Sequence, residues 1–347
     1  MGGSNIRLYE ALYFIHVSSL VMKKRFVKNI CKQGSMAMLA LLTLYSCKER
    51  DDYPSFDEPV EEVVDQDVLP EDNQKTALVE RIMGKTNYIK TFQMDTTQSV
   101  APGFEYYHLR FISKDDVPIS LHIVEIDQTK AKATMQSLSP YNDYLYSAQL
   151  LPEMIEFNQQ GASGNIIAAM SGDVATSNVP SGSYVKFGRV IKSSNDRTKP
   201  YLGVKKGSDK IEFFNTPDTL LYPKPPIDLT QVKHLIGGSN FLLYQGNQGT
   251  GSAPLAARGA IGISQDESKI YLVSVDGVLA DYSVGITYDD LGTFMKALGC
   301  YTAMENGAGN TNSLAVVDIL NPELAWIQKN RVSIFSGASN AIGFVVK

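Results

Sequence analysis

Towards its C-terminus the chain reads RGAIGIS (258–264), YLVSVDG (271–277), SVGITYDDLGTFMKALGC (283–300), AMENGAGNTNSLAVV (303–317) and SNAIGFVV (339–346). Short apolar runs alternate here with turns rich in Gly and Asn, and one helical segment interrupts them. Glycine permits tight turns and a close approach of the backbone to a ligand. We therefore expect a sheet whose strand ends carry loops suited to a binding or catalytic site.

Strand signals also dominate the preceding part of the chain. Residues 104–113 (FEYYHLRFIS) and 118–127 (PISLHIVEID) are rich in aromatic and β-branched residues and alternate in part between polar and apolar positions. They predict two strands, and the polar residues 114–116 suit a hairpin connection between them. Residues 165–170 (NIIAAM) predict a short buried strand, after which we expect a long loop over residues 171–188.

Three segments predict helices. Residues 149–160 carry apolar side chains at helical spacing, and residues 230–235 are expected to form a short helix. The clearest helix begins after Thr287, which can cap it, has Asp290 three residues later, runs to about Leu298 and is expected to stop at Gly299. Because helices are few and not regularly interleaved with strands, we expect an α+β fold of mixed, mainly antiparallel sheets with a few helices packed on them.

Composition excludes several classes of function. The 347 residues carry a formal net charge of −5 and no long basic run, so a nucleic-acid partner has no electrostatic footprint. The sequence contains no Walker-type or dinucleotide glycine pattern, and we expect no cofactor. Four His without His-x-His or Cys-x-x-Cys spacing leave a metal site unsupported, so we also expect no metal.

The N-terminal segment predicts export. A basic stretch begins at Met22, the apolar run 35–45 (SMAMLALLTLY) follows, and Ser46 precedes Cys47. A basic head, a short apolar core and a small residue at the cleavage site make a secretory signal. The run is shorter than the about 20 apolar residues that a membrane-spanning helix needs. We expect a signal segment over residues 1–46, with the true start at Met22.

The cysteine after this signal resembles the lipidated cysteine of bacterial lipoproteins. Charged residues 48–52 directly behind Cys47 resemble the surface-export signals of Bacteroidetes lipoproteins. The expected location is therefore the outer membrane of the cell envelope, with a lipid anchor at Cys47. Residues 47–74 are rich in Asp, Glu and Pro and predict a disordered tether. Residues 75–347 then form the folded domain.

The order of segments from Arg258 onward resembles the phosphodiester glycosidase family. The family pattern has R-T-A-I-G, a strand ending D-G-R, S-x-G-x-T before a helix that ends L-G-C, a glycine-rich loop and a closing N-A-I strand. This chain has matching residues at 258–262, 276–278, 283–287, 298–300 and 340–342. Upstream, residues 168–191 and 234–246 resemble the family's A-A-x-N-G stretch and its G-G turn.

The chain also departs from the family pattern. Ser171 stands where the family has Asn, Val174-Ala175 replace two Phe residues, and Val278 replaces the Arg of D-G-R. In the glycine-rich loop, an ungapped alignment puts Gly307 at the family's Asp, whereas a shift of one residue puts Asn306 there. The resemblance therefore implies the family's fold more firmly than its activity.

The implied reaction is the cleavage of a sugar from a glycosyl phosphodiester. The leaving phosphate monoester is stable, with a second pKa near 6, so cations and N–H donors near the phosphate matter more than a second carboxylate. The resemblance implies Arg258 as phosphate clamp, Asp276 as stabiliser of the sugar cation and Glu305 as base. Each also has a structural interpretation: an arginine in an ion pair, an Asp-Gly turn and a tight loop.

Other residues of the matched motifs are the expected substrate-binding set. They are Ser171, Gly172, Asp173, Gly237, Gly238, Gly277, Ser283, Thr287, Asn306, Gly309, Asn310, Thr311 and Asn312. The expected partner is a carbohydrate or glycosyl-phosphate ligand. We expect a lipid-anchored hydrolase acting on glycan phosphodiesters. The alternatives are a catalytically degenerate lipoprotein that binds the same ligand and a structural envelope lipoprotein.

Overall fold

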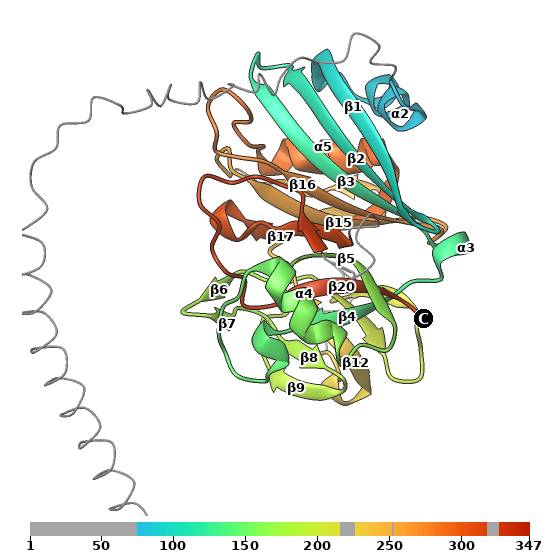
Figure 1. Ribbon diagram of the computed structural model, residues 1–347, viewed down its shortest axis with the longest axis vertical. Coiled ribbons are helices and arrows are strands. Elements are labelled where there is room, and N and C mark those ends of the chain that lie inside the picture. Colours follow the sequence, from blue (N-terminus) through green and yellow to red (C-terminus); the bar gives the residue numbers. More distant parts are fainter. Residues whose placement is uncertain (1–74, 216–225, 252, 318–325) are drawn as a thin grey trace, which may run out of the picture. The chain divides into compact units, whose positions relative to one another are not determined.

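The computed structural model describes residues 75–215, 226–251, 253–317 and 326–347 (Figure 1). These residues belong to one compact unit, Leu69–Lys347. The expected signal segment, the lipidation site at Cys47 and the acidic tether up to residue 74 lie outside the described residues and stay predictions. Among the helices of the described part of the chain, none has the length and apolar character needed to cross a bilayer.

The largest sheet has eight strands, and all its pairings are antiparallel. Its spatial order is β1 (Ile89–Ala101), β2 (Phe104–Ser113), β3 (Pro118–Asp127), β16 (Lys269–Val275), β15 (Arg258–Ser264), β17 (Cys300–Ala308), β13 (Phe241–Tyr244) and β14 (Asn247–Gln248). The expected hairpin of β2 and β3 is present, with His108 directly opposite His122.

Two five-stranded antiparallel sheets and one small hairpin complete the strands. The second sheet is β19 (Trp326–Gln328), β18 (Leu314–Val317), β5 (Asn165–Ser171), β20 (Ala341–Val346) and β4 (Thr134–Leu138). The third is β11 (Ile211–Phe214), β10 (Tyr201–Lys205), β12 (Val232–Gly237), β8 (Tyr184–Lys186) and β9 (Arg189–Lys192). The hairpin pairs β6 (Ala175–Thr176) with β7 (Val179–Pro180).

The helices are short and lie outside the sheets. The α-helices are α2 (Ala77–Lys85), α3 (Gln128–Ala131), α4 (Leu151–Gln159) and α5 (Tyr288–Leu298), and single 3-10 turns are η2 (Pro140–Asn142), η3 (Leu229–Gln231) and η4 (Gly309–Thr311). Thr287 caps α5 by accepting a hydrogen bond from Asp290 N, and Gly299 ends it in the left-handed conformation, as the sequence predicted. The expected α+β fold of mainly antiparallel sheets is confirmed.

The core is arranged in layers. One face of the eight-stranded sheet packs on α2 and α5, for example through Phe111 and Phe294. Its other face packs on the second and third sheets, where Phe104, Leu272 and Phe344 are fully or nearly fully buried. Helix α4 covers the far face of the second sheet (Figure 1).

Two expectations about local structure were wrong. Residues 171–188 are not one long loop, because they contain the β6–β7 hairpin and the buried strand β8. Residues 230–235 are not a helix: the chain makes one 3-10 turn at η3 and then enters β12. Strand β12 lies between β10 and β8 and is buried on both faces, so its apolar residues do not alternate and imitate a helical pattern.

Antiparallel pairing gathers the ends of distant segments at one place. The start of β15 lies beside the ends of β16 and β17, since Arg258 pairs with Val275 on one side and Ala308 on the other. In the second sheet the end of β5 lies between β18 and β20, with Ser171 opposite Ala341. Turn η4 connects β17 of the first sheet to β18 of the second. These strand ends and η4 surround the candidate site.

Candidate active site

A cavity of about 390 Å³ opens where these strand ends meet. Three segments line it, from the end of β5 into the β6–β7 hairpin, from the end of β17 into η4, and before β20: Ser171, Asp173–Ala175, Ser177, Asn178, Gly307, Ala308, Thr311 and Ser336–Ser339. Pockets for small ligands usually measure about 300–1,000 Å³. The cavity therefore has the volume of a sugar-sized ligand, and Ser171, Asp173 and Thr311 of the expected set line it.

Ser171 has its hydroxyl fixed from one side. Its Oγ accepts a hydrogen bond from Ser313 N at 3.1 Å, and its own N donates to Ser313 O at 2.9 Å. A Cβ at Gly307 would lie 2.4 Å from Ser171 Oγ, so only glycine fits opposite this hydroxyl. The O–H of Ser171 remains able to donate to a ligand oxygen.

Asp173 belongs to the lining of the cavity, and its side chain, only 1% exposed, is held in an ion pair. Lys199 Nζ lies 2.8 Å from Asp173 Oδ1, and Ser181 Oγ donates to the same oxygen at 2.9 Å. Lys199 also donates to Gly238 O at 2.6 Å. A Cβ at Gly237 would lie 2.9 Å from Asp173 Oδ2, so glycine is needed there to admit this carboxylate, whereas a Cβ at Gly238 would lie 2.6 Å from Glu305 O.

Gly172 is positioned by the same close packing. Its N donates to Asn340 O at 3.1 Å, and the following N, of Asp173, donates to Asn340 Oδ1 at 2.8 Å. A Cβ at Gly172 would lie 2.1 Å from Asn340 Oδ1. The expected Gly172, Asp173, Gly237 and Gly238 therefore lie together beside the cavity.

Arg258 and Glu305 form a second buried ion pair. Arg258 Nη1 donates to Glu305 Oε1, while its Nε donates to Ile286 O at 2.9 Å and its Nη2 to Pro254 O at 2.7 Å. Burial raises the pKa of Glu305, and the charges of Arg258 and Lys199 oppose that shift. The guanidinium expected to clamp phosphate thus has its donors engaged inside the protein and does not line the cavity.

Several polar backbone groups of the glycine-rich loop form hydrogen bonds within the protein. Gly309 N donates to Ala257 O at 2.9 Å and Asn312 N donates to Gly309 O at 3.1 Å. Thr311 Oγ1 donates to Ala308 O at 3.0 Å, and Asn310 O accepts from Ser336 N at 2.9 Å. The N–H groups of Gly309 and Asn312, two residues of the expected substrate-binding set, are therefore used within the protein.

Two asparagines of this loop are buried. Asn312 Nδ2 donates to Ser274 Oγ at 2.9 Å and to Val275 O at 3.1 Å, which ties the loop to the end of β16. Asn306 is fully buried, and within the described residues neither its Oδ1 nor its Nδ2 has a hydrogen-bond partner. Asn312 thus links the cavity to the residues around Asp276.

Asp276 is fully buried and lies outside the lining of the cavity. Its Oδ2 accepts from Ser120 Oγ at 2.6 Å and contacts His122 Nε2 at 2.9 Å, and its Oδ1 accepts from Arg331 N. His122 Nδ1 in turn lies 2.8 Å from the hydroxyl of Tyr106. The carboxylate is therefore the centre of a polar network on the strands β2, β3 and β16.

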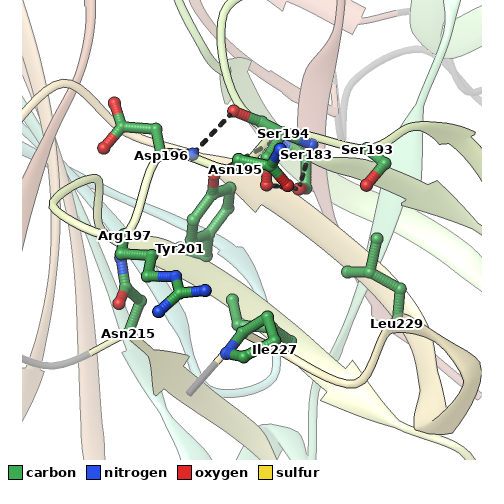
Figure 2. Close-up of a pocket in the computed structure, with 11 residues that line it drawn as sticks. Ser183, Ser193, Ser194, Asn195, Asp196, Arg197, Tyr201, Asn215, Ile227 and Leu229 are labelled. Carbon is green, nitrogen blue, oxygen red and sulfur yellow. Dashed lines mark hydrogen bonds between the residues drawn. The ribbon is translucent and has the colours of Figure 1, made fainter. Parts of the chain in front are cut away.

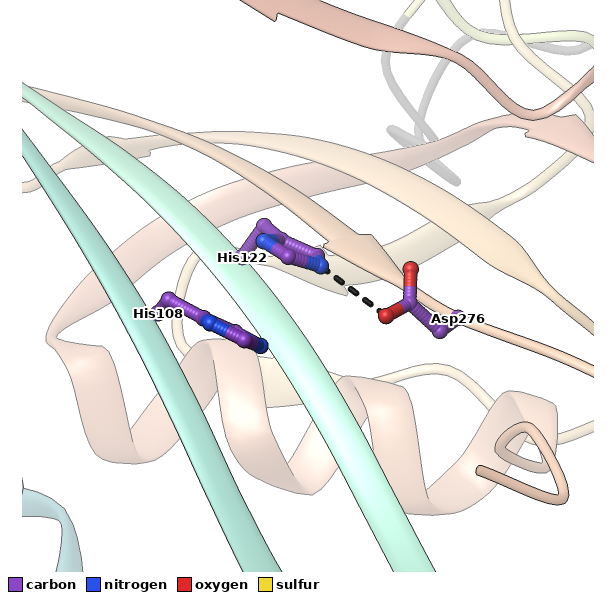
Figure 3. Close-up of side chains that lie close together, drawn as sticks. All are labelled: His108, His122 and Asp276. Atoms are coloured by element: carbon purple, nitrogen blue, oxygen red, sulfur yellow. Dashed lines mark hydrogen bonds and ion pairs between the residues drawn. The ribbon is translucent and has the colours of Figure 1, made fainter. Parts of the chain in front are cut away.

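This network contains metal-ligand residue types but lacks the geometry of a metal site. Ligand atoms of His108, His122 and Asp276 lie within 4.8 Å of one another (Figure 3). The two imidazoles are stacked, with centroids 4.3 Å apart and planes 10° apart, so their nitrogens point the same way instead of converging. Zinc requires convergent ligands at about 2.0–2.1 Å. The expected absence of a metal stays a prediction.

Cations around the network also oppose a metal ion. Burial, followed by the charges of His122, Arg110, Arg331 and Lys329, lowers the pKa of His108 to about 2. The guanidinium carbons of Arg110 and Arg331 lie 4.5 and 4.9 Å from the ring centre of Tyr282. His108 is therefore neutral at pH 7, and the local charge is positive.

The remaining expected residues have structural partners. Ser283 Oγ donates to Asp276 O at 2.8 Å and accepts from Ser120 N at 3.1 Å. Gly277 N donates to Arg331 O at 3.2 Å. Thr287 caps α5 and does not line the cavity. These three residues shape the strand ends, and their expected role in binding substrate stays a prediction.

Sequence reasoning missed several residues of the site. Ser336–Ser339 line the cavity, and the only sequence signal was a run of small residues before the closing strand. Lys199 was missed because it follows its partner Asp173 by 26 positions in an irregular segment. His122, Ser120 and Tyr106 had no signal, since they contact Asp276 or its partners only through sheet register.

A second hollow in the third sheet is too small for a sugar. It measures about 60 Å³ and is lined by residues that include Ser194, Arg197 and Tyr201 (Figure 2). Since one water occupies about 30 Å³ in the liquid, this hollow admits only a few waters. None of the expected site residues lines it.

A known protein family matches the C-terminal half of the chain. The sequence profile of the phosphodiester glycosidase family matches residues 164–342, more than half of the chain. No curated protein sequence matches the chain significantly.

Two solved structures resemble this one in fold. The zebrafish N-acetylglucosamine-1-phosphodiester alpha-N-acetylglucosaminidase catalytic domain, auto-inhibited by its pro-peptide, superimposes with a TM-score of 0.50 at 17% identity, over 73% of this chain and 88% of that one. A hypothetical protein from Synechocystis superimposes with a TM-score of 0.51 at 12% identity, over 71% of this chain and 62% of that one. At these identities the likeness concerns the fold alone.

Proposed function

Because the chain belongs to the phosphodiester glycosidase family, we propose that it hydrolyses the bond between a sugar and the phosphate of a glycosyl phosphodiester. The zebrafish protein is described by its name as acting on an N-acetylglucosamine-1-phosphodiester. For this chain the sugar and the phosphate partner are open, and the substrate class is a glycan that carries such a diester.

The observation that carries the proposal is the lining of the 390 Å³ cavity. Ser171 and Asp173 come from the part of the chain that resembles the family's N-G motif, and Thr311 comes from its glycine-rich loop. All three lie within the matched residues 164–342. Ser171 and Thr311, which are 140 residues apart in the chain, thus both line one cavity of sugar size.

The chemistry requires little proton transfer to the leaving group. The bond between sugar C1 and the ester oxygen breaks, positive charge develops on the ring, and water adds to C1 and loses one proton. The phosphate monoester leaves with the bonding electron pair and is stable as an anion at neutral pH. In this proposal Ser171 donates a hydrogen bond to a substrate oxygen, and the buried carboxylate of Asp173 supplies negative charge from within the cavity wall.

The alternating charges behind the cavity suit that role for Asp173. Lys199 pairs with Asp173 and partly offsets the rise that burial causes in the pKa of Glu305, which itself pairs with Arg258. Negative charge held close to the sugar stabilises a developing cation and requires no proton transfer. In this proposal Glu305 and Arg258 do not contact the ligand, and their buried ion pair stabilises the strands behind the cavity.

A second candidate function is binding of the same ligand without turnover. It is favoured by the engagement of every candidate carboxylate: Asp173 with Lys199, Glu305 with Arg258, and Asp276 with His122 and Ser120. It is also favoured by Ser171, which stands at the family's Asn. A protein of this kind would hold a glycan phosphodiester at the cell envelope and release it unchanged.

One pair of measurements separates the two functions. The purified protein is incubated with methyl α-N-acetylglucosaminyl phosphate and methyl α-mannosyl phosphate, and free sugar is quantified while heat of binding is recorded. Sugar release by the wild type that is reduced in the Asp173→Asn variant supports hydrolysis. Heat without sugar release supports binding alone, and neither signal with either diester contradicts both.

We further propose that the protein is exported and anchored by lipid at Cys47, on the sequence pattern of residues 22–47. In cells fed radioactive palmitate, the wild-type protein would incorporate label and fractionate with the outer membrane. Cys47→Ser would abolish the label and release the protein from membranes. Label that persists in Cys47→Ser would contradict the anchor.

A further inference from the structure

The loop of residues 141–150, here named the aromatic loop, exposes an unusual amount of apolar surface. It reads YNDYLYSAQL and connects η2 to α4. Tyr141 is 53% exposed, Leu145 73% and Tyr146 45%. Tyr141 meets the exposed Phe157 of α4 edge to face, with ring centres 5.5 Å apart. Contiguous exposed apolar surface of this kind marks interaction sites in soluble proteins.

The aromatic loop is anchored in the core by a buried lysine. Lys186 on β8 is almost completely buried, and its Nζ donates to Ser139 Oγ at 2.5 Å, Asn142 Oδ1 at 2.6 Å and Asn158 Oδ1 at 2.7 Å. Burial lowers the pKa of Lys186 to about 8. A charge buried among neutral oxygens is unfavourable, so something other than stability accounts for holding Asn142 in this way.

The conformation of the aromatic loop is also fixed locally. Tyr141 and Asn142 adopt φ of 55° and 56°, the left-handed region that side-chain-bearing residues rarely occupy. Tyr141 N donates to Gln149 Oε1 at 2.7 Å, which holds the two ends of the loop together. Strained backbone of this kind concentrates at ligand sites. The loop thus presents its rings in one defined arrangement.

The aromatic loop is continuous with the wall of the cavity. Gln149 and Ala338 exchange backbone hydrogen bonds, with N–O distances of 3.1 and 2.9 Å. A Cβ at Gly337 would lie 2.7 Å from Gln149 N, so the two segments touch. Gly337 and Ala338 line the cavity. A ligand that fills the cavity and extends past these residues would therefore reach the exposed tyrosines.

Two cations, Arg189 and Lys192 of β9, flank the aromatic loop, which itself carries the carboxylate of Asp143. The guanidinium of Arg189 lies 4.2 Å from the ring centre of Tyr144. Lys192 on the same strand donates to Pro180 O in the β6–β7 hairpin that lines the cavity. The surface between loop and cavity thus combines aromatic rings with cations, which is complementary to a sugar chain that carries phosphate.

We propose that the aromatic loop is a glycan-binding platform that receives the sugar chain attached to the phosphodiester in the cavity. The C–H face of a sugar ring carries partial positive charge and packs on the negative face of an aromatic ring. Asn142, Asp143 and Ser147 between the rings supply polar groups for the sugar hydroxyls. This assignment rests on the proposed function for its choice of a phosphate-bearing glycan.

Binding to yeast phosphomannan, a polysaccharide with sugar-1-phosphodiester links, tests this proposal. The double variant Tyr141→Ala/Tyr146→Ala removes two exposed rings, and Ile327→Ala removes an exposed apolar side chain of 40% exposure on β19 as a matched control. We expect calorimetric affinity for phosphomannan to fall about tenfold or more in the double variant and to stay unchanged in the control.

A conservative variant separates ring stacking from folding. Tyr146 donates its hydroxyl to Ile191 O at 3.2 Å, and Tyr146→Phe removes this bond while keeping the ring. Tyr146→Phe should retain phosphomannan affinity. Equal loss in Tyr146→Phe and in the double variant would overturn the stacking role, and unchanged affinity in the double variant would overturn the platform.

The small diester methyl α-mannosyl phosphate distinguishes this inference from the proposed function. If the wild type cleaves the diester but binds phosphomannan no more tightly, the platform is refuted and the hydrolase stands. If phosphomannan binding depends on the loop but neither compound is cleaved, hydrolysis is refuted and the platform stands. Loss of binding to anionic lipid vesicles, instead of phosphomannan, in the double variant would assign the loop to membranes and overturn the inference.

Discussion

Arg258 and Glu305 lie on neighbouring strands of the eight-stranded sheet and form an ion pair that is almost completely buried. Two further N–H donors of the guanidinium reach the carbonyls of Ile286 and Pro254. This arrangement fixes the start of β15 to the segment before α5. The guanidinium of this arginine, which belongs to the R-T-A-I-G motif, therefore faces the protein interior, and its expected role as phosphate clamp stays a prediction.

Removing one partner of this pair should destabilise the fold strongly. Arg258→Met would leave Glu305 as an uncompensated buried charge, which costs about 3–5 kcal/mol. The double variant Arg258→Met/Glu305→Leu should recover most of that loss, because no buried charge remains. Urea denaturation of the three proteins measures the effect. A stable, folded Arg258→Met that has lost only phosphate affinity would instead establish Arg258 as a clamp.

Gly307 should tolerate no side chain. A Cβ there would lie 2.4 Å from Ser171 Oγ, so Gly307→Ala displaces the hydroxyl on the cavity wall and costs about 1–3 kcal/mol. Activity on a small diester should fall as well. Ser171→Gly/Gly307→Ala removes the collision and should restore stability without activity. Stability of Gly307→Ala equal to the wild type would contradict the close contact in the structure.

The network around Asp276 should be a major source of stability. Asp276→Ala would leave the hydroxyl of Ser120, the N–H of His122 and the backbone N–H of Arg331 without their acceptor, which costs about 3 kcal/mol or more. Ser120→Ala, which removes one hydrogen bond, should cost about 1 kcal/mol. Thermal unfolding of the two variants compares these costs, and equal melting temperatures would refute the network.

Lys186 should make stability depend on pH in the alkaline range. Burial lowers its pKa from 10.5 to about 8, so the folded protein releases this proton before the unfolded chain does. Below pH 8 both states are protonated and the penalty for the buried charge, up to about 3 kcal/mol, is fully present. As pH rises from 8 towards 10.5, the penalty is relieved and the free energy of unfolding rises.

Lys186→Met provides the control for this dependence. Comparing urea denaturation at pH 7, 8, 9 and 10 removes the contributions of all other groups, including the buried tyrosines, whose raised pKa values act in the opposite direction above pH 10. The wild type should gain stability relative to Lys186→Met between pH 8 and 10. A constant difference would show that the ammonium is not penalised.

The sequence correctly predicted the elements whose ends depend on nearby residues. Thr287 and Gly299 mark the two ends of α5, because capping and left-handed termination depend on the residues themselves. The β2–β3 hairpin followed from two β-rich segments and a polar turn. Strand β12 was mistaken for a helix because its pairing with β10 and β8 is non-local and buries both faces.

The candidate site was predictable only where the family pattern reached it. Ser171, Asp173 and Thr311 were identified from motif positions, and they line one cavity. The ion pair of Asp173 with Lys199 and the stacking of His108 on His122 depend on sheet register and loop course, which the sequence does not encode locally. The same is true of the burial that removes Arg258 and Asp276 from the cavity wall.

The central claim, that the cavity beside Ser171 is where a glycosyl phosphodiester is hydrolysed, is tested most directly by filling it. Ala308 lies half-buried on the cavity wall, and Ala280 is an exposed alanine away from it. We predict that the wild type and Ala280→Phe release sugar from methyl α-N-acetylglucosaminyl phosphate or its mannosyl counterpart at equal rates, and that folded Ala308→Phe loses activity about a hundredfold or more. Sugar release by Ala308→Phe at the wild-type rate would contradict the assignment.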